Sequence, residues 1–409
     1  MRRVILILVV LGLIAAGLVV YLAATTPKTA AGVRFPLRAS HRTLLARVPA
    51  SAEAFALIPT AAALHAELLA NPVTRGPIEQ WTDKQSHLPS PWMLGRADVV
   101  AWKVGKVTSY AIRLDPVRAF FVRLSLMIGG GPEVRWDGST VIMSPTVDAG
   151  MGEAALAPLL NIAEGLPGGD ALVLQLDRQS SGGFPPLQRP TASTIAVDAK
   201  TILITSRGPA APADATAILP AVVIPASFPQ GAMLSAWFLQ PPRVVGDLNR
   251  IFGSKVSSLL DGGGSIAIYD IETGTLLPRP KGVIAAPTTP EGLGNLQELA
   301  NLIGETREQG GQTLVSLDRT SMSLYIKDTF VPPAWPANRW ALRMDPQRMV
   351  PVLEDLSDSQ GLRYATPRIH RSVRDLRRWI GALREASAIE AADSVSGGYE
   401  ELRVRIASK

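Results

Sequence analysis

Two patterns of apolar and polar residues alternate along this chain. Short runs in which apolar and polar residues alternate with a period of two predict β-strands, as in Ala50–Pro59, Ala97–Pro116 and Glu133–Met143. The Ala/Leu-rich stretch that follows Thr60 and stops before Pro72 predicts a helix, with Thr60 as its cap. Strands and helices mixed in this way predict an α+β fold, with mostly antiparallel sheets and helices on one face.

The second half of the chain repeats this order. The strand-like Ala232–Pro241 and the helix-like Pro242–Phe252 correspond to the first strand and helix, and Gly264–Pro290 corresponds to the strand pair in Ala97–Pro116. Later counterparts are the helices Val117–Ile128 and Glu291–Glu305, the hairpins Glu133–Met143 and Gln312–Ile326, the strands Ala171–Gln179 and Trp340–Arg348, and the final strands Ser193–Thr205 and Tyr399–Ile406. The sequence therefore predicts two divergent copies of one antiparallel-sheet-plus-helices unit, residues 46–208 and 226–409, joined by a Pro/Ala-rich linker, residues 209–225.

Two nonapeptides are identical at five of nine positions, and they exchange Ile for Leu and Leu for Met: YAIRLDPVR (Tyr110–Arg118) and WALRMDPQR (Trp340–Arg348). In each, an alternating strand leads into Asp-Pro. The carboxylate suits the free N–H groups of a first helical turn, and proline lacks the N–H that would have no partner there. We expect structural caps at equivalent strand-to-helix junctions of two lobes. The four cap residues are Asp115, Pro116, Asp345 and Pro346. The alternative is an Arg/Asp acid–base pair, but a capping carboxylate beside arginine has a lowered pKa and carries protons poorly.

The N-terminus carries the longest apolar run of the chain. Val4–Ala24 contains no charge, follows Arg2 and Arg3, and is long enough to cross the hydrocarbon core as a helix of about 20 residues. A cleaved signal peptide, the alternative, has an apolar region of only about 7–15 residues. Because the arginines should stay in the cytoplasm, we expect a bacterial inner-membrane protein with a cytoplasmic N-terminus and a periplasmic bulk. Residues 1–24 are the predicted anchor, and residues 25–45 are a predicted polar tether.

The composition and the missing motifs exclude several kinds of functional site. The 409 residues include no cysteine, which excludes disulfides and thiolate metal sites, and the four histidines show no zinc-ligand spacing. No nucleophile elbow or phosphate-binding loop is present. Beyond residue 28 there are 38 basic and 35 acidic residues, a balance that does not indicate nucleic acid as a partner. We therefore expect no catalytic residue, no metal and no cofactor.

One segment, Thr366–Ala386 (TPRIHRSVRDLRRWIGALREA), combines many arginines with an apolar stripe at helical spacing. The stripe consists of Ile369, Val373, Leu376, Ile380 and Leu383. A basic amphipathic helix can lie on an anionic membrane or contact a partner. The simpler interpretation is a surface helix whose stripe packs on the sheet and whose arginines are solvated. The candidate partner- or lipid-facing residues are Arg371, Arg374, Arg377, Arg378 and Trp379.

The stretch Val48–Pro59 (VPASAEAFALIP) and its following Ala/Leu helix complete the layout. With the N-terminal apolar run, this layout resembles uncharacterised bacterial single-anchor envelope proteins that have a duplicated α+β exterior domain. The resemblance implies an envelope location and transfers no catalytic residue. We expect a membrane-anchored, non-enzymatic protein that binds another protein, as an accessory subunit of a larger membrane complex. A lipid- or amphiphile-binding protein and an enzyme without a recognisable motif are the alternatives.

Overall fold

The structure is a computed structural model of the whole chain. It describes residues 31–84, 94–105, 107–129, 134–144, 150–176, 187, 190–210, 227–239, 264–273, 278–287, 305–335, 337, 339–358 and 379–409. The chain divides after Pro209 into two compact units, called unit 1 and unit 2 here. The predicted anchor Val4–Ala24 lies outside the described residues and stays a prediction. Among the helices that are described, none has the length and apolar character needed to cross a membrane.

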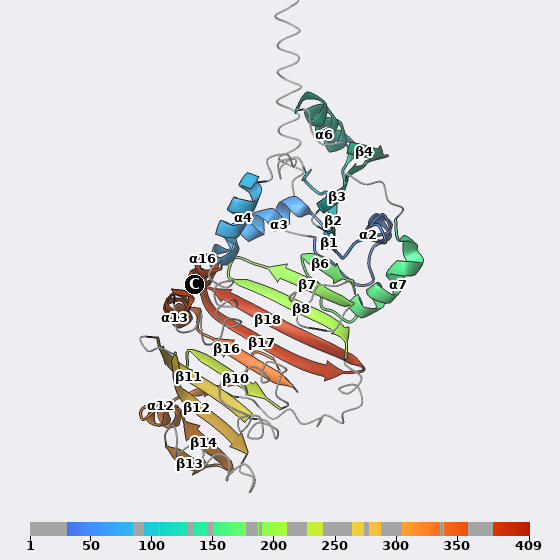
Figure 1. Cartoon of the computed structure of the whole chain (residues 1–409). Helices are drawn as coiled ribbons and strands as arrows, with labels where there is room; N and C mark the ends of the chain where they lie inside the picture. Colours follow the sequence, from blue (N-terminus) through green and yellow to red (C-terminus); the bar gives the residue numbers. More distant parts are fainter. Residues whose placement is uncertain are drawn as a thin grey trace, which may run out of the picture. The chain divides into compact units, whose positions relative to one another are not determined.

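Unit 1 contains one antiparallel sheet with helices packed on it (Figure 1). Its strands are β1 (Ala54–Ile58), β2 (Asp98–Val104), β3 (Val107–Arg113), β4 (Val134–Asp137), β5 (Thr140–Met143), β6 (Ala171–Gln175), β7 (Thr191–Val197) and β8 (Thr201–Pro209). They are arranged in the order β8-β7-β6-β1-β2-β3-β5-β4, and every neighbouring pair is antiparallel. The helices are α2 (Ala39–Leu45), α3 (Ala61–Ala70), α4 (Pro72–Lys84), α6 (Pro116–Gly129) and α7 (Gly152–Ala163).

Unit 2 is also built on an antiparallel sheet. Its strands are β10 (Leu234–Phe238), β11 (Gly264–Glu272), β12 (Arg279–Pro287), β13 (Thr306–Gln309), β14 (Gln312–Ser316), β16 (Trp340–Met344), β17 (Ala386–Ser396) and β18 (Tyr399–Ser408). They are arranged in the order β18-β17-β16-β10-β11-β12-β14-β13. A separate two-stranded pair joins β9 (Phe228–Pro229) to β15 (Phe330–Val331). The helices are α12 (Ser321–Lys327), α13 (Pro346–Asp358) and α16 (Ile380–Glu385).

The two sheets share one strand order. In unit 1, β1 lies between β6 and β2, and in unit 2, β10 lies between β16 and β11. A short hairpin, β4–β5 or β13–β14, forms one edge of each sheet. β6 and β16 hold the same place, as the match between Ala171–Gln179 and Trp340–Arg348 predicted. β3, however, is the counterpart of β12. The expectation that the two nonapeptides lie at equivalent junctions is therefore wrong, because an Asp-Pro cap is a local signal that suits any strand-to-helix junction.

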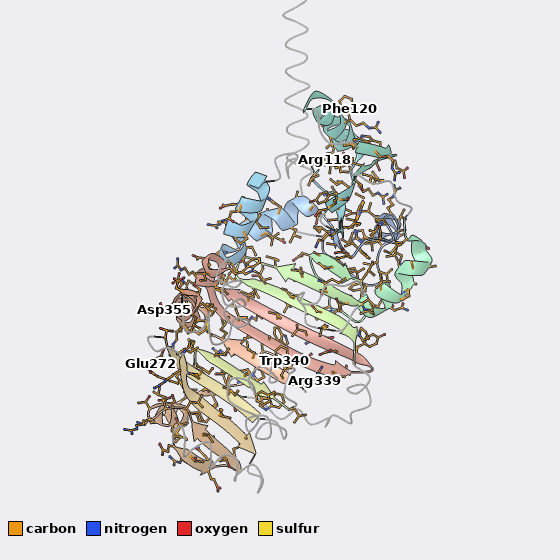
Figure 2. All side chains as sticks on the ribbon, viewed as in Figure 1. Arg118, Phe120, Glu272, Arg339, Trp340 and Asp355 are labelled. Atoms are coloured by element: carbon orange, nitrogen blue, oxygen red, sulfur yellow. The ribbon has the colours of Figure 1, made fainter. Side chains whose placement is uncertain are left out.

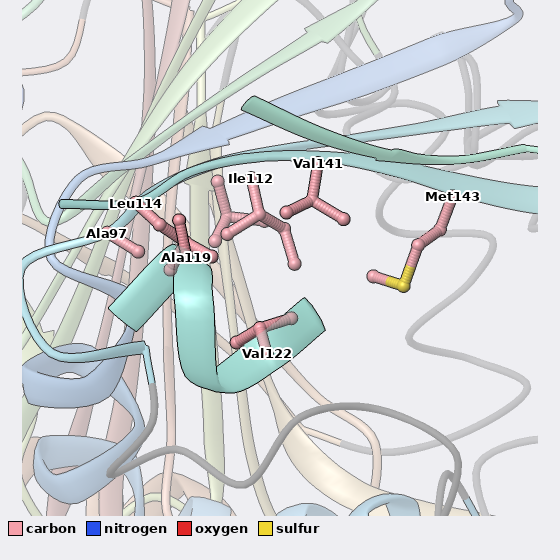
Figure 3. Close-up of a cluster of buried hydrophobic side chains, with 8 residues drawn as sticks. Ala97, Ile112, Leu114, Ala119, Val122, Val141 and Met143 are labelled. Carbon is pink, nitrogen blue, oxygen red and sulfur yellow. The ribbon is translucent and has the colours of Figure 1, made fainter. Parts of the chain in front are cut away.

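The core of unit 1 beneath α6 shows why that helix forms where it does. Ala119 and Val122 point from α6 toward the sheet, where they pack against Ile112, Val141 and Met143 (Figure 3). Val122 and Val141 are almost completely buried. The three-residue spacing of Ala119 and Val122 is the helical period, so the apolar pattern and the observed packing agree.

Unit 2 has helices on both faces of its sheet. Helices α13 and α16 cover the face that carries Leu234, Ile268 and Met344, which lie opposite one another on adjacent strands. Helix α12 packs on Ala285 and Leu314. The residues next to these along their strands are Ile284 and Val315, which belong to the face covered by α13 and α16. Because successive strand residues point to opposite faces, α12 lies on the other side. The predicted single helical face is therefore wrong for unit 2.

The predicted tether is partly folded onto unit 1. Residues 31–45 include α2, and Val33, Leu37, Leu44 and Leu45 are buried. His41, which the sequence pattern placed in the tether, is buried on α2 with its Nε2 3.4 Å from Asp98 Oδ2. The described part of the segment is thus packed structure. Its apolar residues are too widely spaced among polar ones for a periodic pattern to predict this.

Of the turns and caps predicted from short stretches of sequence, some are confirmed and others are wrong. The Asp137-Gly138 turn is confirmed: it joins β4 to β5, and Gly138 has a φ of 58°. The predicted hairpin Gln312–Ile326 is wrong in its second half, because Asp318 accepts backbone N–H bonds from Thr320 and Ser321 and starts α12. The predicted cap Thr60 makes no side-chain cap bond, and its φ of 51° is left-handed. The 11 residues of β17 were not predicted at all.

Candidate functional site

Only the end of the Arg-rich segment is described by the structure. Arg371, Arg374, Arg377 and Arg378 lie outside the described residues, and their partner- or lipid-facing role stays a prediction. Trp379 is 52% exposed and precedes α16. Of the predicted apolar stripe, Ile380 is buried and Leu383 packs beside it against α13. The described end of this segment therefore buries its apolar stripe and leaves the tryptophan at the surface. Arg384, in the last turn, pairs with Glu354 of α13 at 2.5 Å.

The first Asp-Pro junction is a cap reinforced by an ion pair. The Asp115 carboxylate accepts a hydrogen bond from the Arg118 backbone N–H at 3.0 Å, and Pro116 is the first residue of α6. Its second oxygen is 2.7 Å from Arg118 Nη1, and the Arg118 side chain is only 2% exposed. Partial burial alone would raise the pKa of Asp115, but the hydrogen bonds and charge of Arg118 bring it below its ordinary value. A carboxylate held in this way stabilises structure and is poorly suited to proton transfer.

The second junction uses the same cap without the ion pair. Asp345 accepts hydrogen bonds from the backbone N–H groups of Gln347 at 2.9 Å and Arg348 at 3.4 Å, and Pro346 begins α13. The Arg348 guanidinium turns away and donates to the backbone carbonyls of Gly231 and Tyr269. Asp115 and Asp345 belong to different units, and each accepts backbone N–H bonds from its own helix start, so each is a structural cap in its own surroundings.

Unit 2 contains a buried carboxyl group, that of Asp393, which the sequence pattern did not predict. A row of directly paired residues crosses four strands of the sheet: Phe238, Trp340, Asp393 and Leu402. Asp393, which is 1% exposed, thus occupies a position where its neighbours on β16 and β18 are apolar. Arg339 and Trp340 lie at the start of β16 (Figure 2). Alternation of apolar and polar residues could have predicted the buried position of Asp393. The sequence around it is rich in Ala and Ser, however, and shows no clear period of two.

Two carboxyl groups share one arginine here. Arg339 Nη1 contacts Glu400 Oε1 and lies 3.5 Å from Asp393 Oδ2. The oxygens of Asp393 accept no hydrogen bond of standard geometry within the described part of the chain, although Glu400 and Trp340 approach them. Burial, and then the Glu400 charge, raise the pKa of Asp393 to about 7, with Arg339 acting in the opposite direction. Asp393 is therefore a proton-binding group in the neutral range.

Large apolar side chains are exposed at a few described positions. They are Val107, Phe120, Leu324, Phe330 and Trp379. Leu324 and Phe330, 49% and 39% exposed, come from neighbouring elements of unit 2, and the Phe330 ring stacks edge-on against Tyr325 at 5.1 Å. We call Leu324, Tyr325 and Phe330 the α12–β15 surface. Met322 anchors this helix in the core, and β15 pairs with β9, so the surface is held by packed structure.

Unit 1 has a shallow groove beside α7. It has a volume of about 350 Å³ and is lined by Arg42 of α2 and by residues of α7 that include Glu153, Leu156, Leu160 and Glu164. This volume is at the lower end of the range for small-molecule sites, about 300–1,000 Å³. The groove does not include Asp393. In the part of the chain that the structure describes, no three His, Asp or Glu side chains gather in a way that could hold a metal ion.

Comparisons with family models, with curated proteins and with solved structures found no match to this chain.

Proposed function

We propose that this chain is a membrane-anchored envelope protein that binds another protein and catalyses no reaction, as an accessory subunit of a larger membrane complex. The predicted helix Val4–Ala24 would hold it in the inner membrane, with its N-terminus in the cytoplasm and units 1 and 2 in the periplasm. The observation that carries the binding role is the α12–β15 surface, where Leu324 and Phe330 expose apolar area on packed elements.

The chemistry of this surface suits a protein partner. Aromatic side chains and leucine that are already fixed by packing lose little conformational entropy on binding, and burying them releases about 25 cal/mol per Å² of apolar surface. Tyr325 adds a rigid aromatic ring stacked on Phe330. Aromatic anchors of this kind are enriched in the energetic centres of protein interfaces.

A photo-crosslinking residue placed in the full chain tests this role in native membranes. We expect a benzoylphenylalanine at position 324 or 330 to yield one discrete adduct, and the same residue at the equally exposed Val107 of unit 1 to yield none. Phe330→Asp should then lower recovery of the crosslinked partner about tenfold, the effect of losing about 1.4 kcal/mol of binding. Equal adducts at all three positions, or none at 324 and 330, would contradict the proposal.

The matching strand orders support a further part of the proposal: units 1 and 2 arose by duplication of one antiparallel-sheet-plus-helices unit. Eight strands arranged with the same crossings in both units are hard to reach twice by separate routes, because many other arrangements satisfy the general rules of sheet topology. The two copies have since acquired different helices, and only unit 2 has the β9–β15 pair among the described elements.

Binding of a lipid or another amphiphile is the second candidate function, and the α7 groove is what favours it. Leu156 and Leu160 offer apolar contacts, and Arg42 offers a positive charge for an anionic headgroup. Glu153 and Glu164 line the same groove, so such a headgroup would also meet two carboxylates. Native mass spectrometry of the full chain tests this candidate: a bound lipid that Arg42→Gln removes would favour it over protein binding alone.

A further inference from the structure

The first described residues show where the N-terminal segment joins unit 1. The Ala31 N–H donates a hydrogen bond to Thr60 Oγ1 at 2.7 Å. Two residues later, the fully buried Val33 forms a β-bridge with Gly169. Only six residues separate Ala31 from the predicted membrane helix Val4–Ala24, and six extended residues span about 20 Å at most. An inserted helix would therefore hold Ala31 within about 20 Å of the membrane surface.

Ala31 arrives at one particular end of the unit 1 sheet. β1 leads directly to Thr60, the residue that Ala31 contacts. Ile58, the last residue of β1, pairs with Val99 of β2. Asp98, the first residue of β2, pairs with Arg113, the last residue of β3. The ends of β1 and β3 therefore lie on either side of the start of β2. We call this the proximal end. Val107, at the start of β3, marks the distal end, and the seven residues of β3 separate the two by about 20 Å.

Basic and aromatic side chains are exposed at the proximal end. Arg96 and Arg113 are exposed, and neither has an ion-pair partner among the residues that the structure describes. Phe120, in the second turn of α6, is 60% exposed and points away from the sheet core (Figure 2). The start of α6 is held against the turn at Arg96, because the Arg118 side chain lies over Gly95, so close that a Cβ there would be 2.2 Å from its Cζ.

The segment that follows Ala31 adds two more exposed arginines. Arg34 follows the Val33 bridge, and Arg38 immediately precedes α2, the helix whose His41 contacts Asp98 at the proximal end. We define the proximal surface as Arg34, Arg38, Arg96, Arg113 and Phe120.

The carboxylates at this end already have partners. The pairs are Asp98 with His41 at 3.4 Å, Asp115 with Arg118 at 2.7 Å and Asp137 with Arg47 at 2.5 Å. Farther along the same end, Asp170 and Asp198 accept backbone N–H bonds from Val197, Lys200 and Thr201. Asp115 and Asp137 are each neutralised by another arginine, whereas hydrogen bonds leave Asp170 and Asp198 charged. The positive charge at this end is therefore concentrated on the proximal surface itself, which includes four arginines and no carboxylate.

We infer that unit 1 rests on the bilayer through its proximal surface, with the arginines on anionic phospholipid headgroups and the Phe120 ring at the boundary of the acyl chains. This inference rests on the proposed membrane anchor. Basic side chains are attracted to an anionic surface, and aromatic rings favour the interface. The six-residue connection keeps the surface close to the membrane, so weak individual contacts suffice to hold it there.

The absence of cysteine from the chain allows a clean test with single labels. Full-length Phe120→Cys and Val107→Cys variants carry an environment-sensitive fluorophore and are inserted into nanodiscs that contain a lipid with a quenching group on its acyl chain. We expect quenching at position 120 to exceed that at position 107 at least about threefold in discs rich in phosphatidylglycerol. Arg96→Gln with Arg113→Gln should reduce the quenching at 120 by about half, because two of the four arginines are lost. Discs of phosphatidylcholine alone remove the attraction of all four arginines and should reduce it further.

Two outcomes separate this inference from the anchor on which it rests. If the full chain does not co-elute with nanodiscs, the proposed anchor fails, and the docking inference fails with it. If the chain co-elutes but positions 120 and 107 are quenched equally, the anchor stands and the docking inference is overturned. A label at Arg96→Cys provides a second reporter on the same surface if the Phe120 variant folds poorly, and it should follow the pattern expected for position 120.

Discussion

The two Asp-Pro junctions have five of nine residues in common but are stabilised differently. At Asp115 the carboxylate caps α6 and also pairs with a buried arginine of the same turn. At Asp345 the carboxylate caps α13 alone, while the arginine three residues later binds backbone carbonyls of other segments. The comparison teaches that a short motif fixes its own local hydrogen bonds, whereas the surroundings decide what its charged side chains contribute.

The largest expected effect in this comparison comes from Asp115→Ala. The change removes the cap and leaves the buried Arg118 without its carboxylate, so the free energy of unfolding of unit 1 should fall by about 3 kcal/mol. Hydrogen exchange of unit 1 peptides, followed by mass spectrometry, measures this effect. Because the pKa of Asp115 is lowered in the folded chain, its stabilisation is present at neutral pH and is lost as the pH falls through that folded pKa. A loss no larger than that of Asp345→Ala would contradict the role of the ion pair.

A second, smaller effect concerns the buried carboxyl of unit 2. The pKa of Asp393 is raised to about 7, so the folded chain holds a proton that the unfolded chain has released between about pH 4 and pH 7. Stability contributed by this proton is complete at acidic pH and is lost as the pH rises through 7. Unit 2 should therefore lose about 2 kcal/mol of unfolding free energy between pH 5 and pH 8 in the native chain.

Asp393→Asn should abolish most of this pH dependence, since the amide carries no charge at either pH. Urea unfolding of unit 2, monitored by hydrogen exchange at pH 5 and pH 8, compares the variant with the native chain. Glu400→Gln serves as the control, because it removes the neighbouring charge while leaving Asp393 able to titrate. Parallel pH profiles for the native chain and Asp393→Asn would show that another group is responsible.

The smallest expected effect is that of Asp345→Ala. Here only a cap is lost, because Arg348 does not depend on the carboxylate, and such substitutions cost about 1 kcal/mol. Exchange of the first turn of α13 should accelerate, while the strands of unit 2 keep their protection. A loss approaching that of Asp115→Ala would mean that Asp345 has a charged partner that the cap alone does not explain.

Much of the fold could be predicted from the sequence where signals are local. Alternation located β1, β2 and β3, and the Asp137-Gly138 turn located the β4–β5 hairpin. Asp-Pro correctly predicted the starts of α6 and α13. These features depend on a few neighbouring residues, and so a single sequence contains the information needed.

Features that depend on distant contacts were missed. Val33 is buried because it bridges Gly169, more than 130 residues away, and nothing in the segment around Val33 indicates that partner. The pKa of Asp393 is likewise raised first by burial between β16 and β18 and then by the charge of Glu400, neither of which the segment around Asp393 indicates. Of the candidate site, Trp379 is exposed, which both the partner- or lipid-facing role and the simpler surface helix would require. The α12–β15 surface was not predicted, because exposure of Leu324 depends on which side of α12 meets the sheet.

Both units end their sheets in the same way on one side. The outermost strands there, β4 and β13, have only four residues each, and they present charged side chains such as Arg135 and Glu308 to solvent. Short, charged edges offer a poor template for a strand from another molecule. Proteins confined to a membrane meet one another far more often than proteins in free solution. If the proposed anchor holds this chain in a bilayer, these edges should let many copies crowd together there without their sheets joining into fibres.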